Sequence, residues 1–184
     1  MRLLAFLISL IALPAHAQDS GTWTYLQDRQ AIATPALEHV VSPGEAGAPQ
    51  LVIVCNNLTR LTYVDWPTDF GVDRKLLPSH LSVAYDLTGT RADFASGQVW
   101  TVSQSEAGRT YVITHDKIFP EMLMQSDGIQ VTVDRKQNLP AMQASFDLRG
   151  LREALRQNRI ACTNEDQMLQ SRQDAAAPVG PAIP

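Results

Sequence analysis

Cysteine and histidine are scarce in this sequence, and several common catalytic motifs are missing. Its 184 residues include 2 cysteines and 4 histidines. Two cysteines are too few for a zinc site built from four cysteine ligands. No H-E-x-x-H occurs, no serine lies in G-x-S-x-G, and no glycine-rich loop precedes a predicted helix. The sequence therefore offers no motif for a metallopeptidase, a serine hydrolase or a nucleotide-binding enzyme, and we expect neither a metal nor a cofactor.

The charge pattern also excludes some partners. Lys and Arg total 15 and Asp and Glu total 19, both scattered along the chain, for a formal net charge of −4. A nucleic-acid-binding protein usually carries a basic stripe or cluster, and none is present, so we expect no nucleic-acid partner. A basic amphipathic helix that could lie on a membrane surface is missing too.

The first residues have the pattern of an export signal. Arg2 is followed by residues 3–14, an uncharged and mostly apolar run, and then by Ala15, His16 and Ala17, which form an A-x-A cleavage site. The run is too short to cross a bilayer easily, since that needs about 20 apolar residues. We expect residues 1–17 to be a cleaved signal peptide, the mature protein to be periplasmic, and no membrane span to remain after cleavage.

Export bears on the two cysteines, Cys55 and Cys162. In an oxidising compartment paired cysteines usually form disulfides. Neither cysteine has a second ligand at C-x-x-C spacing, which disfavours a metal site. We expect one Cys55–Cys162 bridge, closing a loop of about 100 residues.

Short alternating apolar segments, separated by turn residues, predict a mainly β domain. Residues 51–55 are apolar on both faces, as in a central strand, and residues 60–66 alternate and form a hairpin with them. Helical segments do not alternate with the strands, so we expect an antiparallel β-sandwich or curved sheet rather than a parallel one. The predicted strands are residues 23–26, 36–42, 51–55, 60–66, 81–87, 97–103, 109–114, 129–134 and 142–148.

Two short helices complete the predicted domain. Asp116 is a candidate cap for the first, and Gly150 marks a change to helical spacing for the second, which the disulfide would tie to the central strand. Residues 164–184 become polar and then rich in proline and alanine, a composition that predicts disorder. Residues 18–163 are therefore expected to form a single β-rich domain.

Candidate binding residues come from aromatic and acidic side chains near strand ends. We single out Asp65, Trp66, Asp86 and Trp100, because a half-exposed tryptophan beside a carboxylate could hold a protein or a glycan. The tryptophans could equally complete the core. The neighbouring pair His115 and Asp116 is not expected to act as base and orienter, because adjacent strand residues point to opposite faces.

Three segments stand in a recognisable order: the L-V-I-V-C strand at 51–55, the D-W hairpin end at 65–66, and the F-D-L-R-G-L segment at 146–151 that leads to Cys162. This order resembles the VasI or TagO family of periplasmic accessory proteins of type VI secretion. The likeness spans roughly residues 22–163. The chain departs from the family pattern at Tyr85, where an arginine is common, and in residues 67–80. The resemblance implies the same fold, the Cys55–Cys162 bridge and a role beside a secretion apparatus.

The function expected from the sequence is that of an exported, non-enzymatic domain that binds an envelope or secretion-apparatus protein. One alternative is a cell-envelope hydrolase acting on cell-wall glycan or peptide, which needs two carboxylates, or a histidine and a nucleophile, in one pocket. Another is an exported inhibitor or stress protein, whose loop at residues 67–78 would plug another protein's site.

Overall fold

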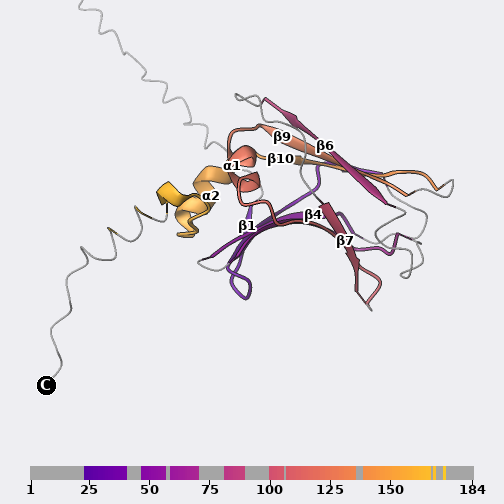
Figure 1. The fold of residues 1–184 in the computed structure, drawn as a ribbon, viewed down its shortest axis with the longest axis horizontal. Helices are drawn as coiled ribbons and strands as arrows, with labels where there is room; N and C mark the ends of the chain where they lie inside the picture. Colours follow the sequence, from indigo (N-terminus) through magenta and orange to yellow (C-terminus); the bar gives the residue numbers. More distant parts are fainter. Residues whose placement is uncertain are drawn as a thin grey trace, which may run out of the picture.

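The computed structural model describes residues 23–40, 47–56, 59–70, 81–89, 100–105, 107–135, 139–166, 168 and 172. Within these ranges the chain is a mainly β structure of two antiparallel sheets packed face to face (Figure 1). The predicted signal peptide and most of the predicted tail lie outside the described residues.

The six-stranded sheet, here called sheet A, has the order β1-β2-β4-β5-β8-β7, and the four-stranded sheet B has the order β3-β10-β9-β6. The strands of sheet A are β1 (Thr24–Leu26), β2 (Ala31–Pro35), β4 (Gln50–Cys55), β5 (Arg60–Trp66), β7 (Trp100–Gln104) and β8 (Thr110–Thr114). Those of sheet B are β3 (Glu38–His39), β6 (Ser82–Thr88), β9 (Gly128–Asp134) and β10 (Met142–Asp147).

The predicted hairpin is the centre of sheet A. β4 pairs along its whole length with β5, from Gln50 opposite Asp65 to Cys55 opposite Arg60. The turn between them is held by Asn56, whose Oδ1 accepts the Thr59 N–H at 2.7 Å. This side-chain bond is the Asx geometry that favours asparagine in tight turns.

The main core lies between the two sheets and follows strand alternation. Sheet A contributes Leu51, Ile53 and Val64, and sheet B contributes Val131 and Phe146, all buried. Alternate residues of each strand point to opposite faces, so these side chains fill the layer where the sheets meet.

Two helices lie at one end of the sandwich (Figure 1). α1 (Phe119–Met124) connects sheet A to sheet B and buries Phe119 and Leu123, and α2 (Leu151–Gln157) follows β10 and buries Leu151 and Leu155. Gly150 precedes α2 with a φ of 81°, a left-handed conformation that glycine adopts without steric cost.

The predicted disulfide is present. Cys55 at the end of β4 bonds to Cys162, 107 residues later, which ties the segment after α2 to the centre of sheet A. Closing a loop of that length stabilises the fold by about 4–5 kcal/mol in the chain-entropy model. The bond between Arg60 Nη2 and Asn164 Oδ1, 2.7 Å long, joins the same two parts of the chain.

The structure corrects two sequence predictions. The pattern at residues 36–42 predicts one strand there, but the chain forms β2 (Ala31–Pro35) in sheet A and then the two-residue β3 in sheet B. The second correction is at residues 164–166, which are helical where the composition predicts the start of a disordered tail.

A capping box explains the helical turn after Thr163. The Asp166 N–H donates to Thr163 Oγ1 at 2.9 Å, and the Thr163 N–H donates to Asp166 Oδ2 at 3.2 Å. A Thr and an acidic residue three positions later satisfy each other's backbone donors and start a helix. In the described part of the chain, no helix is both long and apolar enough to cross a membrane.

Candidate functional site

The outer face of sheet A carries a second apolar cluster, separate from the main core. Cross-strand pairs place Ala33 opposite Val52, Val52 opposite Tyr63, and Tyr63 opposite Ile113, so these side chains form one row on the side away from sheet B. We call the set the outer apolar cluster. Its members are Leu26, Ala31, Ala33, Val52, Val54, Leu61, Tyr63, Tyr111 and Ile113.

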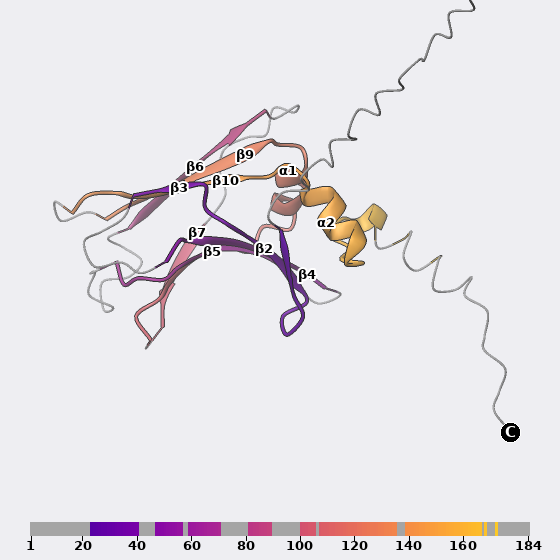
Figure 2. The same ribbon diagram turned by 180° about the vertical axis from the view of Figure 1, so that it is seen from behind.

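The curvature of sheet A explains how an outward face can be partly buried. Figure 2 shows sheet A arching, with the β1–β2 turn and the β7–β8 connection projecting from its outer side. On the concave side of such a curve, larger neighbouring side chains shield small ones from solvent. Ala31 is fully buried and Val52 is 1 % exposed, whereas Val54, Leu61, Tyr111 and Ile113 stay half-buried around them.

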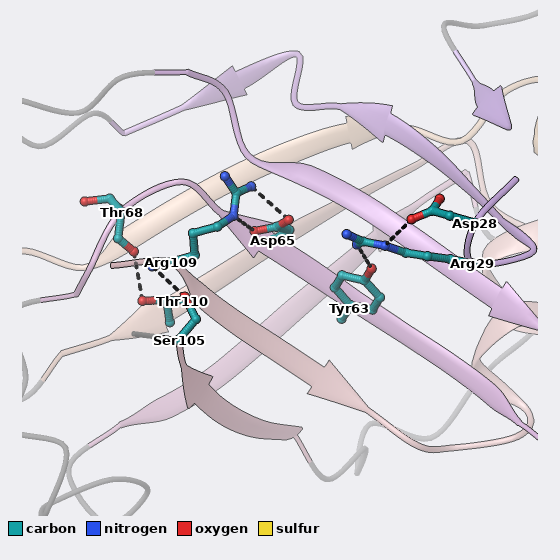
Figure 3. A network of polar contacts seen from close by, with 8 residues as sticks. All are labelled: Asp28, Arg29, Tyr63, Asp65, Thr68, Ser105, Arg109 and Thr110. Carbon is teal, nitrogen blue, oxygen red and sulfur yellow. Dashed lines mark hydrogen bonds and ion pairs between the residues drawn. The ribbon is translucent and has the colours of Figure 1, made fainter. Parts of the chain in front are cut away.

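An ion pair closes one end of this face. The Arg109 guanidinium binds Asp65 in a two-point contact, with Nε to Oδ1 at 3.0 Å and Nη2 to Oδ2 at 2.9 Å (Figure 3). The Asp65 side chain is 8 % exposed and that of Arg109 is 39 % exposed. The hydrogen bond to Asp65 raises the pKa of Arg109 above its usual value.

The β7–β8 hairpin that presents Arg109 is itself fixed by hydrogen bonds. The Arg109 N–H donates to Ser105 Oγ at 3.2 Å, and Thr110 Oγ1 donates to the Thr68 carbonyl at 2.9 Å (Figure 3). These bonds set the backbone on both sides of the ion pair. Arg109 is therefore positioned by the hydrogen bonds of the β7–β8 connection and not only by Asp65.

A second arginine reaches the same face from the β1–β2 turn. Arg29 Nη1 donates to the Tyr63 hydroxyl at 2.9 Å, and Arg29 Nε lies 3.4 Å from Asp28 (Figure 3). The hydrogen bond to Tyr63 is the main reason that the pKa of Arg29 is raised. Arg29 is half-exposed, so it can still contact a partner. Arginine and tyrosine over an apolar floor are among the side chains that most often dominate protein interfaces.

Sheet B presents a different outer face. Its outward residues are mostly short and polar, and cross-strand pairs such as Thr132 with Gln143 join them. This face includes Glu38, Ser82, Ala84, Asp86, Thr88, Gln130, Thr132, Asp134, Gln143, Ser145 and Asp147. Such a surface is well hydrated and typical of the exposed side of a sandwich.

The four candidate residues from the sequence do not meet in one place. Asp65 lies on the outer face of sheet A, and Asp86 is exposed on the outer face of sheet B. Trp66 is 1 % exposed in the core, where its ring meets Phe70 edge-on at 5.3 Å. Trp100 packs against the main core between the sheets. Of the four, Asp65 alone belongs to the polar groups that border the outer apolar cluster.

Trp100 takes part in an aromatic group at the edge between β6 and β7. Its ring lies 5.2 Å from that of Phe119 and 6.0 Å from that of Tyr85. Trp100 Nε1 and the Tyr85 hydroxyl are both buried, and neither has a hydrogen-bond partner among the described residues. Burial, and secondarily the charge of Asp116, raises the pKa of Tyr85. Packing against one another and against the main core explains the positions of the three rings.

The described residues bring together no catalytic pair of the kind the hydrolase alternative needs. His115 is exposed at the end of β8, and Asp65 and Asp86 lie on opposite outer faces of the sandwich. In the same part of the chain, no group of three or more His, Cys, Asp or Glu side chains could hold a metal ion.

Sequence reasoning missed Arg29, Tyr63 and Arg109. A signal for the site was present, because residues 60–66 and 109–114 place apolar or aromatic side chains on both faces of their strands. In an antiparallel sandwich one face normally meets water, so apolar residues on both faces indicate a second covered surface.

Comparison with known proteins adds no relative, since no family model, no curated protein and no solved structure matches the chain.

Proposed function

We propose that this chain is an exported, non-enzymatic binding domain, and that the outer face of sheet A holds a protein partner. The observation that carries the proposal is the outer apolar cluster, which lies on a face that a free-standing sandwich would cover with polar residues. Sheet B of the same molecule has such a polar face, so the difference is specific to sheet A.

The chemistry of the face fits a protein rather than a small molecule. Its centre is an apolar floor of buried residues ringed by half-buried aliphatic and aromatic side chains, and half-exposed Arg29 and Arg109 lie at its two ends. A partner would place aliphatic or aromatic side chains on the cluster and carboxylates or backbone carbonyls on the arginines. Because Arg109 is already paired with Asp65, it would orient a partner more than it would add to the binding free energy.

The place of action follows from the predicted signal peptide and agrees with the Cys55–Cys162 disulfide, since such bonds persist in oxidising compartments. Together with the resemblance to the VasI or TagO family, this makes an envelope or type VI secretion-apparatus protein the proposed partner. The hydrolase alternative is less favoured because its carboxylates lie on opposite sides of the molecule.

The test is cross-linking of the tagged protein in its native cells, with the partners identified by mass spectrometry. Two variants are compared with the wild type. Ile113→Glu places a charge on the outer apolar cluster, and Thr132→Glu places the same charge on the outer face of sheet B. Both positions are half-buried and in the middle of a strand, so the two changes are matched.

We expect the wild type and Thr132→Glu to recover the same envelope or secretion protein, and Ile113→Glu to lose at least nine-tenths of it. Recovery that is equal in all three, with Ile113→Glu still folded by circular dichroism, would rule out sheet A as the binding face. Recovery of no protein above a mock-tag control would leave the hydrolase alternative as the better hypothesis.

A further inference from the structure

The two sheets have four edge strands, and β6 is the longest of them. Sheet A ends in β1 and β7, and sheet B ends in β3 and β6. β1 has 3 residues, β3 has 2, β7 has 5 and β6 has 7. In the described part of the chain β6 pairs on one side only, with β9, and lies along one margin of sheet B (Figure 1). Its other side therefore presents a row of backbone N–H and C=O groups to a further strand.

β6 has few of the features with which proteins usually protect such an edge. Its pairing with β9 runs without a bulge from Ser82 opposite Asp134 to Thr88 opposite Gly128. The strand contains neither lysine nor proline, and Asp86 is its one charged residue. Lysines, prolines and bulges are the common means of stopping another strand from adding to an edge. A long, regular edge without them is suited to strand addition.

The inward side chains of β6 also lack part of the cover that the inner strands have. Val83, Tyr85 and Leu87 pack against the main core but are only half-buried, whereas the inward side chains of β9 and β10 are buried. β9 and β10 each have a neighbour on both sides, and β6 has one. A further strand beside β6 would remove these three apolar side chains from water, which favours its addition.

The sequence of β6 can pair with a second copy of itself. Two antiparallel strands keep their apolar side chains on one face if each inward residue lies opposite another inward residue. Placing Tyr85 on a two-fold axis meets this condition and uses every residue of β6. The resulting pairs are Ser82 with Thr88, Val83 with Leu87, Ala84 with Asp86, and Tyr85 with the same residue of the second copy.

The position of Asp86 selects this register over its neighbours. A pairing centred on Asp86 would set two carboxylates directly opposite each other, which is destabilising. One centred on Ala84 would leave Leu87 and Thr88 outside the pairing. With Tyr85 at the centre, each carboxylate instead faces the small side chain of Ala84. The charged and apolar positions of β6 are therefore complementary about a two-fold axis, which is the symmetry of most homodimers.

We propose that two copies of this chain associate through β6, in antiparallel pairing about Tyr85. Their four-stranded sheets B then join into one continuous sheet. The contact is a single pair of strands, a small interface, so the dimer forms and dissociates with concentration. The inference goes beyond the proposed function, because the outer apolar cluster lies on sheet A and each copy still presents it to a partner.

The experiment measures the mass of the mature chain by sedimentation over a roughly hundredfold range of concentration. Ala84→Asp sets carboxylates opposite each other on both sides of the axis, because position 84 of each copy faces Asp86 of the other. Ala84→Asp/Asp86→Lys turns both contacts into ion pairs, and Ala84→Lys does so from the wild type. Gln143→Glu is the control, since it adds a carboxylate to the outer face of sheet B on β10, which β9 separates from β6. Circular dichroism checks the fold of every variant.

We expect the wild type and Gln143→Glu to reach the mass of a dimer as concentration rises, and Ala84→Asp to dimerise about tenfold more weakly, since two like-charge pairs are created. Ala84→Asp/Asp86→Lys should regain the affinity of the wild type, and Ala84→Lys should exceed it. A chain that stays monomeric at every concentration would overturn the proposal, as would a dimer that responds to none of the changes at position 84. Loss of the dimer in Ile113→Glu but not in Ala84→Asp would also overturn it, by placing the contact on sheet A.

Discussion

The two sheets of this sandwich turn very different surfaces to the outside. The outer face of sheet B is built from Thr, Gln, Ser and Asp side chains, whereas that of sheet A carries a buried valine, two tyrosines and small residues under half-buried aliphatic ones. Both sheets share one core and one pattern of alternation. The shared core therefore does not require the difference, and the proposed partner of sheet A would account for it.

Each face also carries one two-point Arg–Asp pair, and the pairs differ in burial. In the pair on sheet A the Asp65 side chain is 8 % exposed, while the Arg149–Asp147 pair beside sheet B is 74 % exposed at the arginine and 20 % at the aspartate. A buried carboxylate depends on its partner, because water cannot replace the arginine. An exposed pair contributes little.

The largest expected difference between the two outer faces comes from placing the same charge on each of them. Val52→Lys puts an ammonium at a position that is 1 % exposed, on a face where Arg29 and Arg109 already carry positive charge. We expect a loss of about 3 kcal/mol in the free energy of unfolding. Thr132→Lys on sheet B should change it by less than about 0.5 kcal/mol. Urea unfolding of both variants measures the difference, and equal losses would contradict it.

Removing each arginine compares the two ion pairs. Arg109→Ala leaves the Asp65 carboxylate buried without its partner, and we expect a loss of about 2 kcal/mol. Arg149→Ala should cost clearly less, because its partner Asp147 stays accessible to water. The double variant Arg109→Ala/Asp65→Asn should recover part of the loss, since no buried charge remains. A double variant that is less stable than Arg109→Ala would argue against this explanation.

A smaller effect is expected where the Arg29–Tyr63 bond is removed. Tyr63→Phe keeps the ring in the outer apolar cluster and deletes the hydroxyl that accepts from Arg29. Because Arg29 is half-exposed and can bind water instead, we expect a loss of about 0.5–1 kcal/mol. The matched change on sheet B is Thr132→Val, which removes the 3.4 Å bond from Gln143 and should be nearly neutral. Chemical unfolding at one pH distinguishes the two, and an equal loss in both variants would contradict the expectation.

The smallest effect is a pH dependence at the edge of sheet B. Hydrogen bonds from Arg149 lower the pKa of Asp147 in the folded chain. The pair therefore stabilises the fold above about pH 4, where the unfolded carboxyl is ionised, and this contribution disappears as the pH falls through the lower folded-state pKa. We expect Arg149→Ala to reduce the slope of the unfolding free energy against pH in the acid range. An unchanged slope would contradict the assignment to Asp147.

Much of the fold could be predicted from the sequence, because strand alternation is a local signal. Residues 51–55 and 60–66 form the predicted hairpin, and the segments before and after Gly150 form β10 and α2. β2 was missed because Ala31 and Ala33 give little β signal of their own. They are buried through contacts with β4 and β5, which a local pattern does not reveal.

The candidate site was harder to predict for the same reason. Asp65, one of the predicted binding residues, lies in the polar network of this face, but its partner Arg109 is 44 residues away and only strand pairing brings the two together. Trp66, which follows Asp65, points to the opposite side and belongs to the core. Strand alternation places residues that are adjacent in sequence on opposite faces of the sheet. Strand pairing brings residues from β1, β5 and β8 together on one face.

The most direct test of the central claim uses a photo-activated cross-linking residue at single positions in native cells. Tyr111 reports on the outer face of sheet A and Gln143 on that of sheet B, and both are half-buried and point outward. If sheet A is the binding face, irradiation will join the Tyr111 position to one defined envelope or secretion protein and leave the Gln143 position without a product. A product of the same partner from Gln143, or none from Tyr111, would contradict the account.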